Sequence, residues 1–227
     1  MIRRLWVENL GIRFARLRGF VTGLLDRLTD ETRGLHKEIE SEGEGLLRAI
    51  SVPAYRRYLS RWYGFVSPLE RALGVVPGLP RVIDPRRLRK HQLLGHDLPA
   101  LHLKQPDIDA LPTCSVPVFI DVRDGIGWAW VVERATLDHP NLFRRLANAI
   151  PGDIAFASTY LKCYAGAVGE MWRSFGQSLE AASTSVADSD RIVNAARVAY
   201  RHFRRWRHSL DGISPSHAEP LASIGSP

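Results

Sequence analysis

The chain has 227 residues, of which 45% are hydrophobic, enough to build a full core for one large domain or two small ones. Thirty-one basic and 24 acidic side chains leave a formal charge of +7, which permits acidic partners but does not select among nucleic acid, anionic lipid and a dianionic cofactor. The two cysteines, Cys114 and Cys163, lie far apart without metal-ligand spacing, which argues against a disulfide framework or a zinc site and favours a reducing compartment.

Residues 1–27 form a basic amphipathic segment, with apolar residues at helical spacing and arginines between them. Such an arm can rest on a membrane or a partner, but the simpler interpretation is a helix packed on its own domain. Arg13, Arg16 and Arg18 interrupt the apolar residues, which disfavours a secretory signal. No stretch approaches a membrane-spanning length, and we expect a cytoplasmic protein.

The next segment, residues 28–41, reads LTDETRGLHKEIES and predicts a helix that carries His36. Thr29 or Asp30 can cap its start, and Gly43 is expected to stop it. Glu40 lies four residues after His36 and can reach the second ring nitrogen, as the partner of a metal-ligating histidine usually does. Taken alone, the pattern fits a surface or core histidine better than a ligand.

Further helices are expected along the rest of the chain. Clear apolar stripes at helical spacing occur in residues 53–73, 118–137 and 190–210, and the second of these is the most apolar. Asp84 and Asp138, each shortly before a proline, predict the starts of helices at 85–98 and 138–150. A long helix is also expected at 153–179.

The connections are expected to lack regular structure. Residues 74–85 are rich in Pro and Gly, 99–117 contain four prolines and room for one short helical turn, and 211–227 are expected to be disordered. The basic side chains of 85–98 could bind an anion, although a solvated basic face is the simpler interpretation. The predicted organisation is therefore an N-terminal arm at 1–27, an all-α domain at 28–210 and a tail at 211–227.

Four blocks resemble the bacterial heme oxygenases in order and approximate spacing, and most closely those that supply biliverdin to bacterial phytochromes. The blocks are TR-x-x-H-x-x-x-E at Thr32 to Glu40, YRRYLSRWYGFVSPLERAL at Tyr55 to Leu73, WVVERATLDHP at Trp130 to Pro140 and YLKCYAGAVGEMWRSF at Tyr160 to Phe175. The resemblance spans about Leu28 to Trp206 and implies a single all-α domain of the heme oxygenase type.

The resemblance implies that heme is both cofactor and substrate, opened to biliverdin, iron and carbon monoxide with electrons from an external donor. It assigns the axial imidazole to His36, with Glu40 as its hydrogen-bonding partner. It also points to Arg201 and Arg205, one turn apart, as anchors for the two heme propionates, because guanidinium groups pair with carboxylates. The competing interpretation of these two arginines is a solvated basic face.

The distal segment departs from the family pattern. Related enzymes have a glycine-rich run of the form G-S-T-L-G-G, which lets the helix backbone approach the heme and leaves room for oxygen. Here the run reads RATLDH: Arg134, Asp138 and His139 replace the three glycines, Ala135 replaces the serine, and Pro140 follows and can bend or break the helix.

Three structural outcomes follow for this segment. The first is an open heme site left by the break at Pro140, the second is a heme with His139 as its second axial ligand, and the third is a cavity filled by Arg134 and its neighbours. Two functional interpretations follow in turn. The first is a heme oxygenase served by an electron-donating reductase or a phytochrome-type protein. The second is a non-catalytic heme carrier, heme sensor or protein-interaction scaffold. A protein that binds nucleic acid or an anionic membrane would explain the charge but not the ordered blocks, so no nucleic-acid partner is expected.

Overall fold

The structure is a computed structural model that describes residues 23–46 and 48–211. All regular elements in this part of the chain are helices, as the sequence predicts. They are α2 (Leu24–Leu46), α3 (Val52–Gly74), η1 (Leu79–Arg81), η2 (Pro85–Arg87), α4 (Lys90–Ala100), α5 (Gln105–Asp109), α6 (Val122–Ala135), α7 (His139–Ala149), α8 (Pro151–Ile154), α9 (Val168–Ala182) and α10 (Val186–Asp211). None of these helices is long and apolar enough to cross a membrane. The predictions for residues 1–22 and for the tail beyond Asp211 lie outside the described residues.

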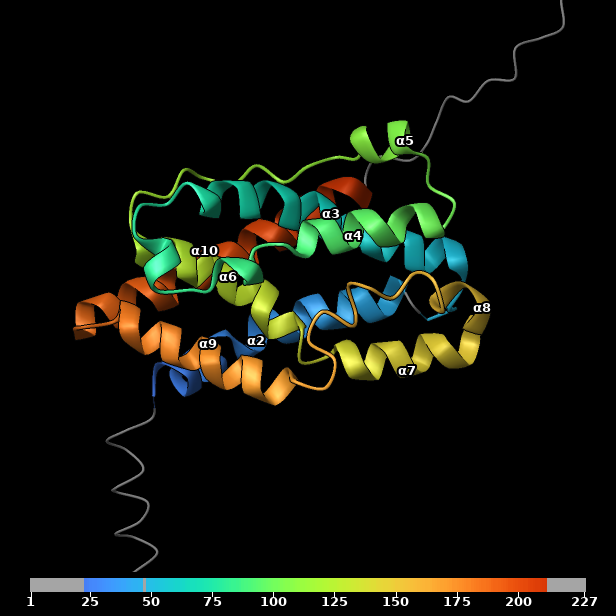
Figure 1. The fold of residues 1–227 in the computed structure, drawn as a ribbon. Helices are drawn as coiled ribbons and strands as arrows, with labels where there is room; N and C mark the ends of the chain where they lie inside the picture. The colour runs from blue at the N-terminus through green and yellow to red at the C-terminus, as the bar shows by residue number, and fades with distance from the viewer. Residues whose placement is uncertain (1–22, 47, 212–227) are drawn as a thin grey trace, which may run out of the picture.

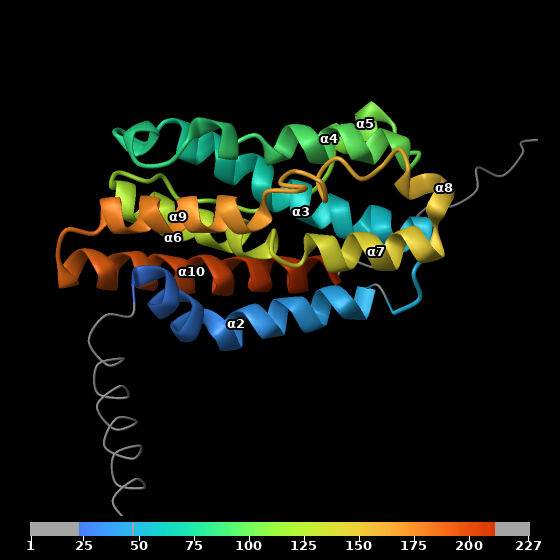
Figure 2. The ribbon, with the colours of Figure 1, turned by 60° about the horizontal axis from the view of Figure 1, so that its bottom comes forward.

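The long helices run roughly alongside one another (Figures 1 and 2). The last helix, α10, packs against α6 on one side and α2 on the other (Figure 2). Helices α2 and α10 run in the same direction, since Arg27 near the start of α2 pairs with Asp190 near the start of α10, and Glu42 near the end of α2 accepts from Arg204. The α6–α10 contact is unusually close at Gly127, where an added Cβ would lie 2.6 Å from both the Cβ of Ala195 and the carbonyl oxygen of Ile192. The two backbones can approach this closely only because Gly127 has no side chain.

The core is rich in aromatic side chains from α3 and α10. The rings of Phe65 and Phe203 have centroids 4.3 Å apart, and Trp62 lies 5.0 Å from Phe203. Trp62 and Phe203 belong to the apolar stripes that predict both helices. Ser51 begins α3 by accepting a hydrogen bond from the backbone N–H of Ala54.

Helix α2 is longer than predicted at both ends. Thr29 does not cap it, because the Thr29 hydroxyl donates to the carbonyl of Leu25 within the helix. Gly43 lies inside α2 and does not end it. As a result His36 lies in the middle of α2, held between α10 and the start of α7.

Three other predicted helices differ from the structure. The helix expected at 85–98 begins at Lys90, after the short 3-10 helix η2. Residues 118–121 are not helical, and Val118 and Ile120 are exposed. Helix α6 begins at Val122, where Asp121 caps it by accepting from the N–H of Arg123. The segment expected to form one helix at 153–179 consists of α8, a run of turns and α9. The fully buried carboxylate of Asp97 explains these turns, since it accepts from the N–H groups of Thr159 and Tyr160 and so holds this loop against α4.

Candidate functional site

A pocket opens between α2, α3, α6, α7 and α10, with a cavity volume of about 90 Å³. It is lined by His36, Ile39, Glu40, Gly43, Tyr58, Trp62, Val131, Ala135, Asp138, Asn141, Leu142, Arg145, Tyr200 and Arg207. The walls are therefore mainly apolar and aromatic, with one histidine, two carboxylates and two arginines. A pocket of this kind suits a ligand that is largely apolar but carries negative groups.

His36 presents its Nε2 atom to this pocket. Its side chain is only 12% exposed, and the buried Nε2 atom has no hydrogen-bond partner. Oδ2 of Asp138 lies 3.3 Å away, within ion-pair distance but too poorly aligned for a hydrogen bond. A buried nitrogen without a hydrogen bond is uncommon in folded proteins and is a natural place for a ligand to bind.

The other ring nitrogen of His36 faces the protein interior. Nδ1 lies 3.4 Å from the hydroxyl of Tyr200 on α10, and the two rings meet edge to face. Glu40, the partner expected from the sequence, has an exposed side chain and lines the pocket instead. The helix spacing that suggested Glu40 is real, but α10 brings Tyr200 to this nitrogen.

The distal segment breaks the helical path between α6 and α7. Helix α6 ends at Ala135, a turn follows, and α7 begins at His139 with Pro140 in its first turn. The side chain of Asp138 does not cap α7 but points toward His36 and, at 3.3 Å, toward Arg134. Burial raises the pKa of Asp138, but the contact with His36 and the charge of Arg134 outweigh this and leave it below its usual value. The pocket is thus lined by Ala135 and Asp138, and not by Arg134.

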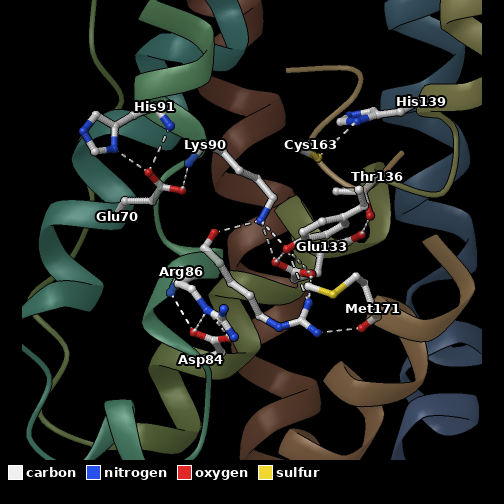
Figure 3. A network of polar contacts seen from close by, with 12 residues as sticks. Glu70, Asp84, Arg86, Lys90, His91, Glu133, Thr136, His139, Cys163 and Met171 are labelled. Atoms are coloured by element: carbon white, nitrogen blue, oxygen red, sulfur yellow. Dashed lines mark hydrogen bonds and ion pairs between the residues drawn. The ribbon is translucent and has the colours of Figure 1, made fainter. Parts of the chain in front are cut away.

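His139 points away from the pocket. Its ring packs against Tyr160 with centroids 4.6 Å apart, and its Nδ1 atom lies 3.8 Å from the sulfur of Cys163 (Figure 3). Burial lowers the pKa of His139 to about 3, so the ring is neutral. This placement does not offer His139 as a second axial ligand, because the residue is not among those that line the pocket.

The structure separates the two expected propionate anchors from the pocket. Arg201 and Arg205 are exposed and do not line it. Arg145 and Arg207 do, and Arg207 is buried, with its Nη1 donating to the carbonyl of Ile39 and its Nε without a partner. The sequence contains a signal for Arg207: it follows Tyr200 and Phe203 on the buried stripe of α10, where a cation is out of place unless it has a role.

A buried charge network surrounds Glu133 of α6 (Figure 3). One carboxylate oxygen accepts from Lys90 and the other from Arg87, each at 2.7 Å, and all three side chains are almost fully buried. The hydroxyl of Tyr164 also donates to Glu133. The solvated basic face expected for residues 85–98 is therefore wrong for Arg87 and Lys90, which cross-link η2 and α4 to α6.

These features together define an all-helical protein that offers a buried histidine nitrogen to a pocket with apolar walls and cationic groups. The family model described as heme oxygenase matches residues 22–209, and the chain belongs to the heme oxygenase family.

Comparison with solved structures agrees on the fold. The chain is similar to the heme oxygenase from Neisseria meningitidis whose structures were determined with NO and CO bound, with a TM-score of 0.71. The match covers 89% of this chain and 98% of the other at 17% sequence identity, and at this identity it supports the fold alone. No curated protein matches the chain.

Proposed function

We propose that the protein binds heme in this pocket through the Nε2 atom of His36 and opens the heme ring oxidatively to biliverdin, iron and carbon monoxide. The observation that carries the proposal is that the pocket of this member of the heme oxygenase family is lined by His36, whose buried Nε2 atom makes no hydrogen bond. When bound, the heme iron would supply the oxygen chemistry, and the protein would supply an axial ligand, a largely apolar cavity and anchoring charges.

The residues of the pocket fit a heme. Apolar side chains such as Ile39, Trp62 and Leu142 suit the faces of a porphyrin, and Arg145 and Arg207 can attract its carboxylates. Asp138 is the exception, because its carboxylate stands close to the atom that would bind iron. It must turn away from Nε2 when a heme enters.

A non-catalytic heme carrier or sensor is the second candidate. The observation in its favour is the distal segment, where Asp138 replaces a glycine of the family pattern and reaches the axial nitrogen. Under this alternative heme would bind but would not be degraded.

The oxidative reaction requires an external electron donor, and we propose a reductase-type protein for that role and a phytochrome-type protein as a recipient of biliverdin. We also propose a cytoplasmic location, since the two cysteines are free thiols.

The test is a titration of purified protein with ferric hemin, followed by addition of a reductant in air. We expect a saturable Soret band that decays to a broad red absorption. His36→Ala should lose the Soret band, and His102→Ala, which removes an exposed histidine, should keep it. A Soret band that survives the reductant would favour the carrier, and the absence of saturable binding would contradict both functions.

A further inference from the structure

We propose that a second, open pocket, between α4 and the loop at 155–167, binds a small organic anion with a flat apolar body. Its cavity volume of about 580 Å³ lies within the roughly 300–1,000 Å³ of typical small-molecule sites. The residues that line it include Leu93, His96, Phe156, Thr159, Lys162 and Cys163. This pocket shares no lining residue with the pocket of His36, so the inference does not rest on heme binding.

The charges of this pocket favour a negative ligand. His96 and Lys162 bring basic groups to it, and no Asp or Glu is among the residues that line it. The ammonium of Lys162 has no carboxylate within ion-pair distance among the described residues, and it lies 4.7 Å from the ring centroid of Phe143. A lysine held over an aromatic ring keeps N–H groups free to donate to an anion. The thiol of Cys163 adds no negative charge, because burial raises its pKa to about 11.

The walls of the pocket are held together before any ligand binds. Nδ1 of His96 lies 3.0 Å from the hydroxyl oxygen of Thr159 and 3.4 Å from Oδ1 of Asp97. The buried carboxylate of Asp97 also accepts from the N–H groups of Thr159 and Tyr160, which ties the loop to α4. Because Nδ1 of His96 is used within the protein, Nε2 is the ring nitrogen left to meet a ligand. Such a fixed site loses little conformational freedom on binding.

Phe156 supplies the apolar part of the site. Its side chain is 75% exposed, and it is the one aromatic among the large hydrophobic side chains that are exposed in the described part of the chain. Leu93 of α4 lines the same cavity and is half-buried. Covering such surfaces with an apolar group is favourable, because it removes them from water.

The two features together select the class of ligand. A bare inorganic anion could pair with Lys162 but would leave the ring of Phe156 in water. A neutral hydrocarbon could cover the ring but would give Lys162 no counter-charge. An organic anion with a flat apolar body satisfies both side chains at once, and the cavity has room for one.

The first experiment titrates the full chain, without heme, with anilinonaphthalene sulfonate, an aromatic anion whose fluorescence rises in an apolar site. We expect saturable binding that Lys162→Gln weakens about tenfold, as the loss of one charge-assisted hydrogen bond would. Phe156→Ala should also weaken it. The matched variants Lys104→Gln and Val118→Ala, at exposed positions elsewhere, should bind as the wild type does.

Circular dichroism checks that each variant keeps its fold. The absence of saturable binding would overturn the proposal. So would binding that neither Lys162→Gln nor Phe156→Ala weakens, because the probe would then occupy another site, such as the pocket of His36.

The second experiment separates the charge from the apolar contact. Phenylnaphthylamine has the same rings without the sulfonate, so Phe156→Ala should weaken its binding and Lys162→Gln should not. At equal ionic strength, inorganic phosphate should displace the sulfonate probe from the wild type no better than chloride does. Displacement by phosphate, or equal losses of the charged and neutral probes in Lys162→Gln, would show that the cavity does not recognise a charge and an apolar body together, and would overturn the proposal.

Discussion

Nε2 of His36 on α2 lies 3.3 Å from Oδ2 of Asp138, the residue that precedes α7. This contact joins the two walls of the pocket between which a heme would have to lie. It also explains why Asp138 does not cap α7, since its carboxylate is directed across the pocket. Asp138 is therefore in contact with the nitrogen that we propose as the iron ligand.

Removing this carboxylate should strengthen heme binding. In Asp138→Ala no side chain has to leave Nε2 before the iron binds, and we expect the dissociation constant for hemin to fall about tenfold, which corresponds to ~1.4 kcal/mol. A hemin titration followed by the Soret band measures the change. Asn141→Ala, which trims another polar side chain of the same wall, should have a much smaller effect. Equal or weaker binding by Asp138→Ala would show that the carboxylate does not compete with heme.

Replacing Arg207 and replacing Arg201 with Arg205, all on α10, should affect heme affinity differently. Arg207 is buried and lines the pocket, whereas Arg201 and Arg205 are exposed outside it. We expect Arg207→Gln to weaken hemin binding about tenfold or more, as the loss of a charge-assisted hydrogen bond would. The double replacement of Arg201 and Arg205 by Gln should leave the dissociation constant nearly unchanged. Circular dichroism of each variant checks that the fold is intact, and the opposite order of affinities would restore the assignment made from the sequence.

The parts of the fold that the sequence predicted well depend on local signals. Helices α3 and α10 follow from the spacing of their apolar side chains. The start of α7 follows from Pro140, because proline is favoured in the first turn of a helix. The loop at 155–167 could not be predicted in this way, because its shape depends on the carboxylate of Asp97, some 60 residues earlier in the chain. A helical pattern cannot reveal such a distant competitor for its N–H groups.

The site shows the same division between local and long-range information. The motif singles out His36, and the structure places this residue in the wall of the pocket, while its role as an iron ligand stays a prediction. Spacing alone predicts Glu40 as the partner of His36, because Glu40 lies one helical turn away. In the structure the residue next to Nδ1 is Tyr200, which is 164 positions from His36 in the sequence and reaches it only because α10 packs on α2. Residues brought together by packing of helices far apart in sequence are the ones that spacing alone cannot identify.

Because the network around Glu133 is buried, a single substitution of this residue should lower the stability of the protein strongly. Glu133→Gln would leave the cations of Arg87 and Lys90 buried without a counter-charge, and we expect the free energy of unfolding to fall by about 3–5 kcal/mol. Denaturant unfolding measures this value. The matched variant Glu38→Gln breaks an exposed ion pair with Arg204 and should cost no more than about 1 kcal/mol. Similar losses in the two variants would mean that the network contributes little.

The last prediction concerns acid sensitivity, and it follows from the burial of His139. Its pKa is about 3 in the folded protein and about 6.5 in an unfolded chain, so below pH 6.5 the unfolded state binds a proton that the folded state does not. The contribution of His139 to stability is therefore complete above pH 6.5 and is lost as the pH falls toward 3, at about 1.4 kcal/mol per pH unit.

Replacing His139 with Gln removes this titration, so the free energy of unfolding of the variant should decline less steeply than that of the wild type between pH 6 and pH 4. Both proteins would be unfolded with urea across this range, because only the difference between their slopes isolates His139 from the carboxylates that titrate in the same region. His102→Gln, at an exposed position, should keep the wild-type slope. Parallel curves for the wild type and His139→Gln would show that His139 takes up its proton equally in the folded and unfolded states, and that its ring is not held neutral by burial.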